Sequence, residues 1–103
     1  MGVKEIGPYA FKFCNNLTEV SIPKSVKIIG SNAFEHCENL AKVTIGNGIK
    51  EICGNAFYGC GLLHEINYQG TVEEWNNITF GTEWNYNVPA LYVVCSDGIV
   101  NIK

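Results

Sequence analysis

Several features that mark nucleic-acid-binding and membrane proteins are missing from this sequence. The seven basic residues are scattered singly along 103 residues, the net charge is −3 and the pI is about 5.2, so the sequence shows no basic patch of the kind that nucleic-acid binding requires. No uninterrupted apolar run approaches the roughly 18 residues that span a bilayer, and the first residues lack the basic and apolar leader of an export signal. The sequence therefore predicts no nucleic-acid partner, no membrane insertion and no export signal in this chain.

Closely spaced cysteine pairs are missing as well. Of five cysteines, Cys14, Cys37 and Cys60 are evenly spaced along the chain. The intervals between them are far longer than in the Cys-x-x-Cys pairs on which metal sites usually draw. Five thiols cannot all pair internally. We interpret the cysteines as small buried hydrophobic residues; one disulfide involving Cys95 and a metal site stay open as alternatives.

What the chain does contain is an internal repeat with a 23-residue period. Residues 26–45 (VKIIGSNAFEHCENLAKVTI) recur once before and once after this central copy, so that Phe34 corresponds to Phe11 and to Phe57. Self-similarity at a fixed period in this range marks a solenoid, in which each unit must stack on its neighbours to bury its apolar side. The repeated apolar positions of the central copy are Val26, Ile29, Ala33, Phe34, Cys37, Leu40, Val43 and Ile45.

Each copy reads as two short extended pieces joined by a compact turn. In residues 17–23 (LTEVSIP), Val20 and Ile22 face one way and the residues between them the other. The turn begins with Ser31 and Asn32, which can cap a helix, so we expect a helical or 3₁₀ turn there. The equivalent residues Phe11, Phe34 and Phe57 should stack as an aromatic column in the core.

The pattern AFxxCxxLxxVxI, followed by IPxSVxxIG, resembles the BspA-like class of bacterial leucine-rich repeats. It is carried by residues 23–30 (PKSVKIIG) and 33–37 (AFEHC), and the resemblance covers residues 3–68. Departures are mild: Cys53 replaces the usual Gly, Tyr68 the strand-end Ile, and residues 46–48 (GNG) the Pro-x-Ser. The resemblance implies an α/β repeat fold, a short leucine-rich-repeat solenoid of three 23-residue coils.

Beyond Tyr68 the period stops. Thr71 with Glu74 forms a capping box that predicts a short helix, and Trp84 and Tyr86 follow in a predicted loop. Two alternating runs around Asp97 and Gly98 predict a β-hairpin. The runs GTVEEWNNI and VVCSDGIVNI are also similar to the C-terminal ends of BspA-like proteins. We therefore expect one domain, residues 1–103, with repeats in residues 3–68 and a C-terminal cap in residues 69–103.

No comparable cap precedes the first coil. Because an uncovered core edge invites association with another chain, we expect a homodimer through residues 3–11. The chain also begins within the repeat pattern, so Met1 and Gly2 are expected to be additions to a piece of a longer protein, with a short cytosolic protein as the alternative.

Catalytic patterns are scarce. A nucleophilic enzyme needs Cys or Ser beside a base, and the only histidines, His36 and His64, fall at repeat positions that vary between copies and should be solvated. The chain has no glycine-rich phosphate loop and no paired-carboxylate motif. We predict no enzyme activity, no catalytic or metal-binding residues and no cofactor; a thiol enzyme using Cys53 or Cys95 is the weakest alternative.

The remaining candidate is a surface, because repeat proteins bind along extended faces. The outward positions of the second extended piece should form a nearly flat polar strip, here called the binding strip: Glu19, Ser21, Lys42, Thr44, Glu65 and Asn67. A second polar strip comprises Lys4, Glu5, Lys27, Lys50 and Glu51. The alternative interpretation is that either strip is only the solvated side of a sheet.

The resemblance implies adhesion to host matrix proteins and to other cells. We therefore expect a non-catalytic protein-interaction module, the C-terminal part of a bacterial cell-surface or secreted adhesin-like repeat protein. Its partner would be a host matrix or cell-surface protein. The alternative is a purely structural segment that caps and spaces a longer array.

Overall fold

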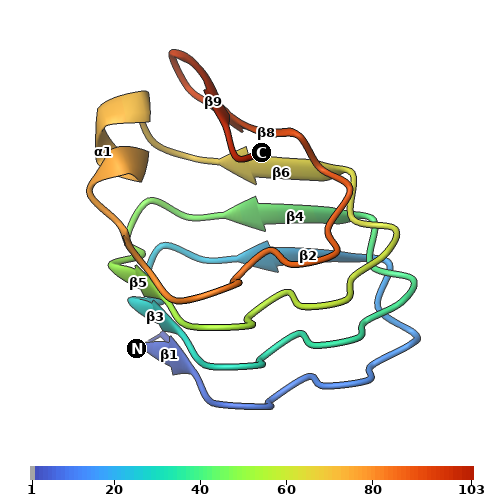
Figure 1. Cartoon of the computed structure of the whole chain (residues 1–103). Helices are drawn as coiled ribbons and strands as arrows, with labels where there is room; N and C mark the ends of the chain where they lie inside the picture. The colour runs from blue at the N-terminus through green and yellow to red at the C-terminus, as the bar shows by residue number, and fades with distance from the viewer. Residues whose placement is uncertain (1) are drawn as a thin grey trace.

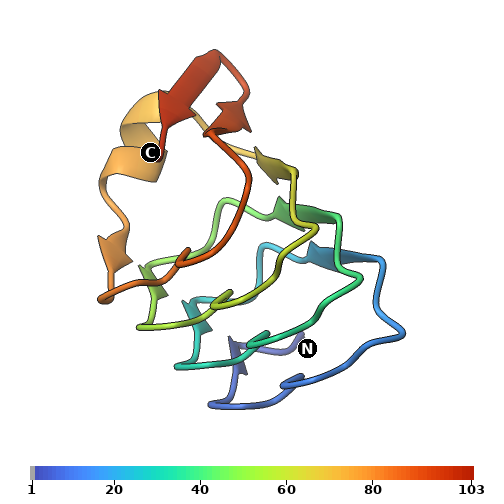
Figure 2. The same ribbon diagram turned by 45° about the vertical axis from the view of Figure 1, so that its right-hand side comes forward.

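The computed structural model describes residues 2–103, so that Met1, the first residue of the expected domain, lies outside the described residues. The chain winds into a stack of coils in which strands from successive coils pair side by side (Figure 1). The N-terminus lies at one end of the stack and the helix and hairpin at the other (Figure 2). Two sheets result, and the space between them holds the apolar core.

Sheet A has the order β1-β3-β5-β7 and sheet B the order β2-β4-β6-β8-β9. Sheet A is built from two-residue strands: β1 (Glu5–Ile6), β3 (Ile28–Ile29), β5 (Glu51–Ile52) and β7 (Thr79–Phe80). Sheet B is built from four-residue strands: β2 (Glu19–Ile22), β4 (Lys42–Ile45), β6 (Glu65–Tyr68), β8 (Tyr92–Cys95) and β9 (Gly98–Asn101). The described part of the chain contains one α-helix, α1 (Val72–Asn76).

The register of the parallel strands follows the 23-residue period through the first three coils. Val20 pairs with Val43, and Val43 with Ile66. Within β4 the inward side chains Val43 and Ile45 are buried, while the outward ones are partly exposed. The predicted leucine-rich-repeat solenoid is therefore confirmed.

The turn between the sheets is not the helical or 3₁₀ turn expected from the sequence. Its backbone has positive φ at Asn32 (59°) and again at His36 (55°), which interrupts any helical run. Between these positions the N–H of Phe34 donates to the carbonyl of Ala56 in the next coil at 2.8 Å. The segment is a series of tight turns whose alternate N–H groups bond to the neighbouring coil instead of to the same turn.

The phenylalanine column (Phe11, Phe34 and Phe57) is confirmed. The ring centroids lie 5.2 Å and 5.1 Å apart, with interplanar angles of 11° and 3°. Beside it, the thiols of Cys37 and Cys60 each donate to the carbonyl of a column phenylalanine in the preceding coil at 3.0 Å. Stacked aromatic rings and buried thiols together fill the centre of the stack.

All five cysteines are free in the structure. Cys37, Cys60 and Cys95 are buried, as interpreted from the sequence, whereas Cys14 and Cys53 are partly exposed. Cys14 is partly exposed because it belongs to the open first coil.

The stack continues where the sequence period stops. Strand β7 pairs with β5 and β8 pairs with β6 in parallel, so a fourth coil follows the three that the sequence predicts. Glu51 pairs with Thr79 and Ile66 with Val93. Paired residues of the third and fourth coils are therefore separated by more than the 23-residue period. The expected loop around Trp84 is the turn of this fourth coil, since the N–H of Phe57 donates to the carbonyl of Trp84 at 2.9 Å.

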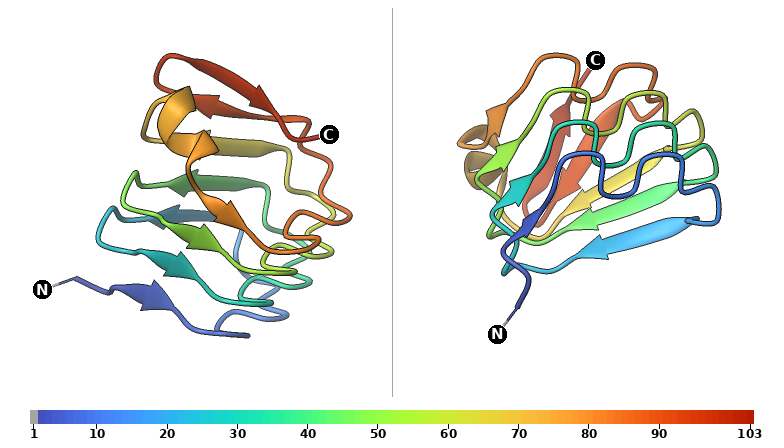
Figure 3. Two further views of the ribbon diagram at one scale, coloured as in Figure 1. Left: turned by 60° about the vertical axis from the view of Figure 1, so that its left-hand side comes forward. Right: turned by 90° about the horizontal axis from the view of Figure 1, so that it is seen from below.

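The predicted cap elements are present at the C-terminal end. Thr71 and Glu74 form the expected capping box at the start of α1, with Glu74 N–H donating to Thr71 Oγ1 at 3.1 Å. Strands β8 and β9 pair antiparallel around the predicted turn. Asp97 in that turn accepts a hydrogen bond at 2.8 Å from the N–H of Val72 in α1, and Figure 3 shows helix and hairpin side by side. No helix in residues 2–103 has the length and apolarity to cross a bilayer.

Candidate functional site

The binding strip lies on the outer face of sheet B. Strands β2, β4 and β6 run parallel in one register, so that its residues form two columns across the coils. Alternation along each strand turns them away from the core, since their neighbours Val43 and Ile66 are buried. The first column is Glu19, Lys42 and Glu65, and the second is Ser21, Thr44 and Asn67.

Charges on the first column alternate in sign. Lys42 Nζ lies 3.9 Å from Glu65 Oε2, and the amide of Asn67 donates to the same carboxylate oxygen at 2.9 Å. The ion pair is half exposed, and such pairs add little to stability. The arrangement thus holds these side chains in place while leaving them available to another molecule.

The structure extends the strip beyond the residues found in the sequence. Val94 pairs with Asn67, which carries the second column onto β8, and Tyr92 two residues earlier continues the first column. On β9, Ile99 lies opposite Val94. The side chains of Tyr92, Val94 and Ile99 are 45%, 40% and 56% exposed. These three residues form an apolar end of the strip.

Two shallow hollows lie along this face. One, of about 300 Å³, is lined by Glu19, Val20, Ser21, Lys42 and Thr44. The other, of about 330 Å³, lies where the polar columns meet the apolar end and is lined by His64, Glu65, Ile66, Asn67, Tyr92 and Val94. The second hollow therefore offers both apolar contact and hydrogen-bonding groups in one place.

Sequence reasoning missed the apolar end because it relied on the 23-residue period. Helix α1 is inserted before β8, so the residues of β8 lie more than 23 positions after their partners in β6. A signal was present, since Tyr92 and Val94 alternate with the buried Val93 and Cys95. Only the pairing of β8 with β6 shows that these residues share a face with the binding strip.

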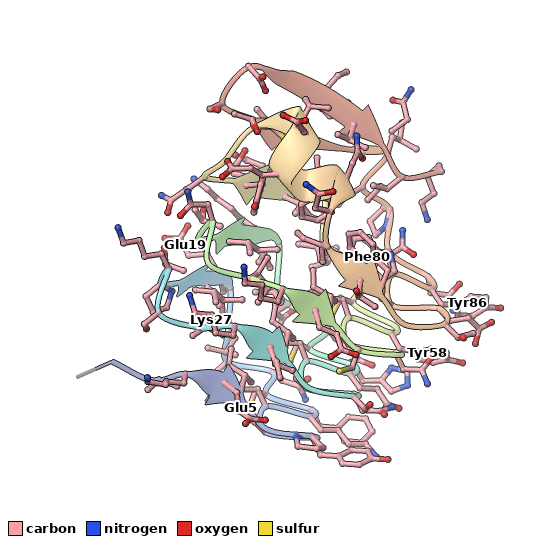
Figure 4. All side chains as sticks on the ribbon, turned by 90° about the vertical axis from the view of Figure 1, so that its left-hand side faces the viewer. Glu5, Glu19, Lys27, Tyr58, Phe80 and Tyr86 are labelled. Carbon is pink, nitrogen blue, oxygen red and sulfur yellow. The ribbon has the colours of Figure 1, made fainter. Side chains whose placement is uncertain are left out.

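The two histidines differ in environment. His36 is only one-third exposed and its ring stacks on Phe13 with centroids 5.3 Å apart, while Nε2 lies 3.7 Å from Glu35 Oε2. His36 is therefore partly exposed and not fully solvated, and its ring belongs to a second, outer row of rings that begins at Phe13. That row continues through Tyr58 and Tyr86 (Figure 4). His64 is exposed, as expected.

The environments of Cys53 and Cys95, the two thiols considered as nucleophiles, do not favour nucleophilic catalysis. Burial raises the pKa of Cys53, and the neighbouring Glu51 carboxylate adds to this effect. Burial likewise raises the pKa of Cys95, next to Asp97. A thiol with a raised pKa stays protonated at neutral pH and is a weak nucleophile. Within residues 2–103 neither histidine ring hydrogen-bonds to a cysteine or serine side chain.

The described residues do not bring potential metal ligands together either. Among the described residues, no three histidine, cysteine, aspartate or glutamate side chains lie close enough together to hold a metal ion. The polar groups of the binding strip are spread along the exposed face of sheet B. The arrangement suits contact over an area more than chemistry at a point.

Comparisons with known proteins agree with this architecture. Residues 2–88 match the model of a family described as the BspA type leucine rich repeat region, in six copies. The chain is also similar to the crystal structure of a T. pallidum leucine rich repeat protein, TpLRR, with a TM-score of 0.70 and 26% sequence identity. The match covers 90% of this chain and 52% of that one, so the chain spans about half the length of TpLRR. No curated protein matches the sequence.

Proposed function

Since this chain belongs to the BspA type leucine rich repeat family, we propose that it is a non-catalytic protein-interaction module that binds through the outer face of sheet B. Repeat proteins use such extended faces to contact other proteins. The observation that carries the proposal is the continuity of one exposed face across five strands, β2-β4-β6-β8-β9. The proposed contact residues are the binding strip (Glu19, Ser21, Lys42, Thr44, Glu65 and Asn67) and its apolar end.

The mixed chemistry of this face supports protein recognition. Protein interfaces are enriched in aromatic residues at the centre and polar residues at the rim. Tyr92 beside the hollow that Glu65 and Asn67 line reproduces that arrangement on a small scale. We expect Tyr92 to contribute most to affinity, with the polar columns setting specificity.

The parent protein we propose is a bacterial cell-surface or secreted, adhesin-like protein, of which residues 1–103 form a single C-terminal domain. Its partner would be a host matrix or cell-surface protein. Family membership supports the compartment, and the capped C-terminal end supports the position. Affinity would then grow with the number of coils and with multivalency instead of depending on one pocket.

A binding assay with matched variants tests the proposal. The immobilised chain is exposed to a panel of purified extracellular-matrix proteins, and capture is compared between the native protein, Tyr92→Ala, Glu65→Lys and Glu38→Lys. Glu38 is an exposed glutamate in the turn between the two sheets, so Glu38→Lys makes the same charge change outside the binding strip. We expect at least about a tenfold loss of affinity for the two strip variants and no loss for Glu38→Lys, with all four proteins folded.

Equal capture by all four proteins would contradict binding through this face. It would favour the purely structural alternative, in which the segment caps and spaces a longer array. Loss of capture that parallels a loss of folded protein would also count against a direct contact.

We also propose that the open first coil mediates a homodimer. Strands β1 and β2 are the outermost strands of their sheets, and Phe11 in the column is 39% exposed. The open end forms an apolar hollow of about 350 Å³, lined by Val3, Ile6, Phe11, Leu17, Val20, Ser21, Ile22, Pro23, Val26 and Phe34. A second copy facing it would bury this surface and pair the free strand edges.

A further inference from the structure

Three lysines that are far apart in the sequence form a row beside sheet A. Lys4, Lys27 and Lys50 come from successive coils, and their backbones are bonded to one another. The N–H of Lys27 donates to the carbonyl of Lys4 at 2.8 Å, and the N–H of Lys50 to that of Lys27 at 2.7 Å. Hydrogen-bonded neighbours of this kind lie about 4.8 Å apart. We call these three residues the lysine row; Figure 4 views this side of the molecule and labels Lys27.

The ammonium groups of the lysine row have no carboxylate partner in residues 2–103. All three side chains are exposed, and no carboxylate oxygen of the described residues lies within 4.0 Å of them, whereas Lys12 and Lys42 pair with Glu35 and Glu65. Their charge is therefore open to solvent and to another molecule.

A column of one sign is unfavourable within a sheet. Like charges directly opposite each other on neighbouring strands are destabilising, and the binding strip avoids this by alternating Glu19, Lys42 and Glu65. The lysine row has no such alternation, so three positive charges lie in line in a protein whose net charge is −3, with Glu5 and Glu51 next to two of them. A local field of this kind attracts an anionic partner.

We propose that the lysine row is a second docking surface, which binds an extended acidic segment of a partner protein. The neighbouring residues decide between a peptide and a uniformly charged polymer. Glu5 and Glu51 follow Lys4 and Lys50 directly in β1 and β5, and they would repel a polysulfate or polyphosphate. A peptide places its carboxylates at alternate positions, about 7 Å apart, and its N–H groups or basic side chains between them.

The geometry fits a short segment. Two steps of the row span about 10 Å of the stack, which three or four residues of an extended peptide cover. Lysine ammonium groups end long flexible stems, so they adjust to the carboxylate spacing. This surface lies beside sheet A and is separate from the binding strip on sheet B, so each proposal can be tested without the other.

Fluorescence anisotropy with a labelled peptide of alternating glutamate and threonine tests the proposal. We expect the native chain to bind it, with an affinity that falls as the salt concentration rises and the Debye length shortens. Lys27→Gln, at the centre of the row, should raise the dissociation constant about fivefold, and the triple glutamine variant of the row should abolish binding. The matched control Lys12→Gln removes one lysine that is paired with a carboxylate, Glu35, and should leave the constant unchanged within about twofold.

Three results would overturn the proposal. The first is that the peptide does not bind the native chain. The second is that Lys27→Gln and Lys12→Gln weaken binding equally. The third is that heparin binds more tightly than the peptide and loses affinity in the same lysine-row variants, which would assign the row to an acidic glycan. Melting curves show whether each variant is folded, and relief of repulsion predicts that Lys27→Gln melts no lower than the native protein.

Discussion

At the scale of single residues, the centre of the phenylalanine column carries the most stability. Phe34 is 1% exposed and contacts a phenylalanine ring on each side. Truncating a buried phenylalanine removes its transfer free energy and leaves a cavity. We predict that Phe34→Ala lowers the free energy of unfolding by about 3–5 kcal/mol, as measured by urea denaturation.

Phe11→Ala is the matched comparison, because Phe11 occupies the same position in the open coil. With one ring face uncovered it should lose only about 1–2 kcal/mol. A loss for Phe11→Ala equal to that for Phe34→Ala would show that the first coil is covered in solution, which bears directly on the proposed dimer.

The residues of the turn explain why the Ser31-Asn32 motif does not begin the helical turn expected from the sequence. Ser31 and Asn32 look like helix caps, but Asn32 has a positive φ and its amide donates to Glu35 Oε1 at 2.6 Å. Asparagine tolerates this backbone region better than most residues. The choice between helix and successive turns depends on hydrogen bonds to the neighbouring coil, such as that from His36 N–H to Tyr58 carbonyl at 2.8 Å. Propensity within one repeat does not contain that information.

At the scale of elements, the helix and the hairpin act as one cap because a single side chain joins them. Asp97 Oδ1 accepts from the N–H of Val72 at 2.8 Å, and this N–H is one that the helix itself leaves unbonded. We predict that Asp97→Ala costs about 1 kcal/mol of unfolding free energy. The measurement is chemical denaturation monitored by Trp75 and Trp84 fluorescence.

Ser96→Ala is the control for that experiment. Ser96 lies in the same turn, and its backbone N–H, which donates to Gly70 carbonyl at 2.8 Å, is kept by alanine. If Ser96→Ala destabilised the protein as much as Asp97→Ala, the turn conformation and not the link to α1 would be responsible.

The fourth coil shows how an insertion hides a repeated element. Helix α1 precedes β7 and lengthens the connection, and Asn85 stands where Phe57 stands in the third coil. Trp84 restores the lost aromatic contact by packing edge-on against Phe57, with centroids 6.4 Å apart. The backbone keeps its path because its hydrogen bonds to the third coil do not depend on side-chain identity.

At the scale of the whole molecule, the two ends of the stack differ. The C-terminal end is covered by α1 and the hairpin (Figure 2). The N-terminal end has the apolar hollow described above. We predict that sedimentation analysis finds a species of about twice 11.4 kDa that dissociates on dilution. Val3→Glu, at an exposed apolar position of the open end, should give a monomer, because it places a charge in the dimer contact.

Leu91→Glu provides the control, since Leu91 is as exposed as Val3 but lies near the other end. It should leave the dimer intact. A native protein that sediments as a monomer at high concentration, or a dimer abolished equally by both variants, would exclude association through the first coil.

The sequence by itself determined the repeat, the identity of the inward residues, the capping box and the hairpin. It could do so because these depend on local periodicity: each coil presents the same positions to the same core. The binding strip could be found in the same way, since Glu19, Lys42 and Glu65 are separated by one repeat.

Only the tertiary structure decided the features that depend on pairing between coils. The fourth coil and the apolar end at Tyr92 and Val94 require the pairing of β8 with β6, across a shift that the repeat does not predict. The lysine row is spread over three coils in sequence and becomes a concentrated charge only when their backbones bond in register. Periodicity identifies what faces inward, whereas stacking decides which outward residues become neighbours, and the proposed binding surfaces consist of those neighbours.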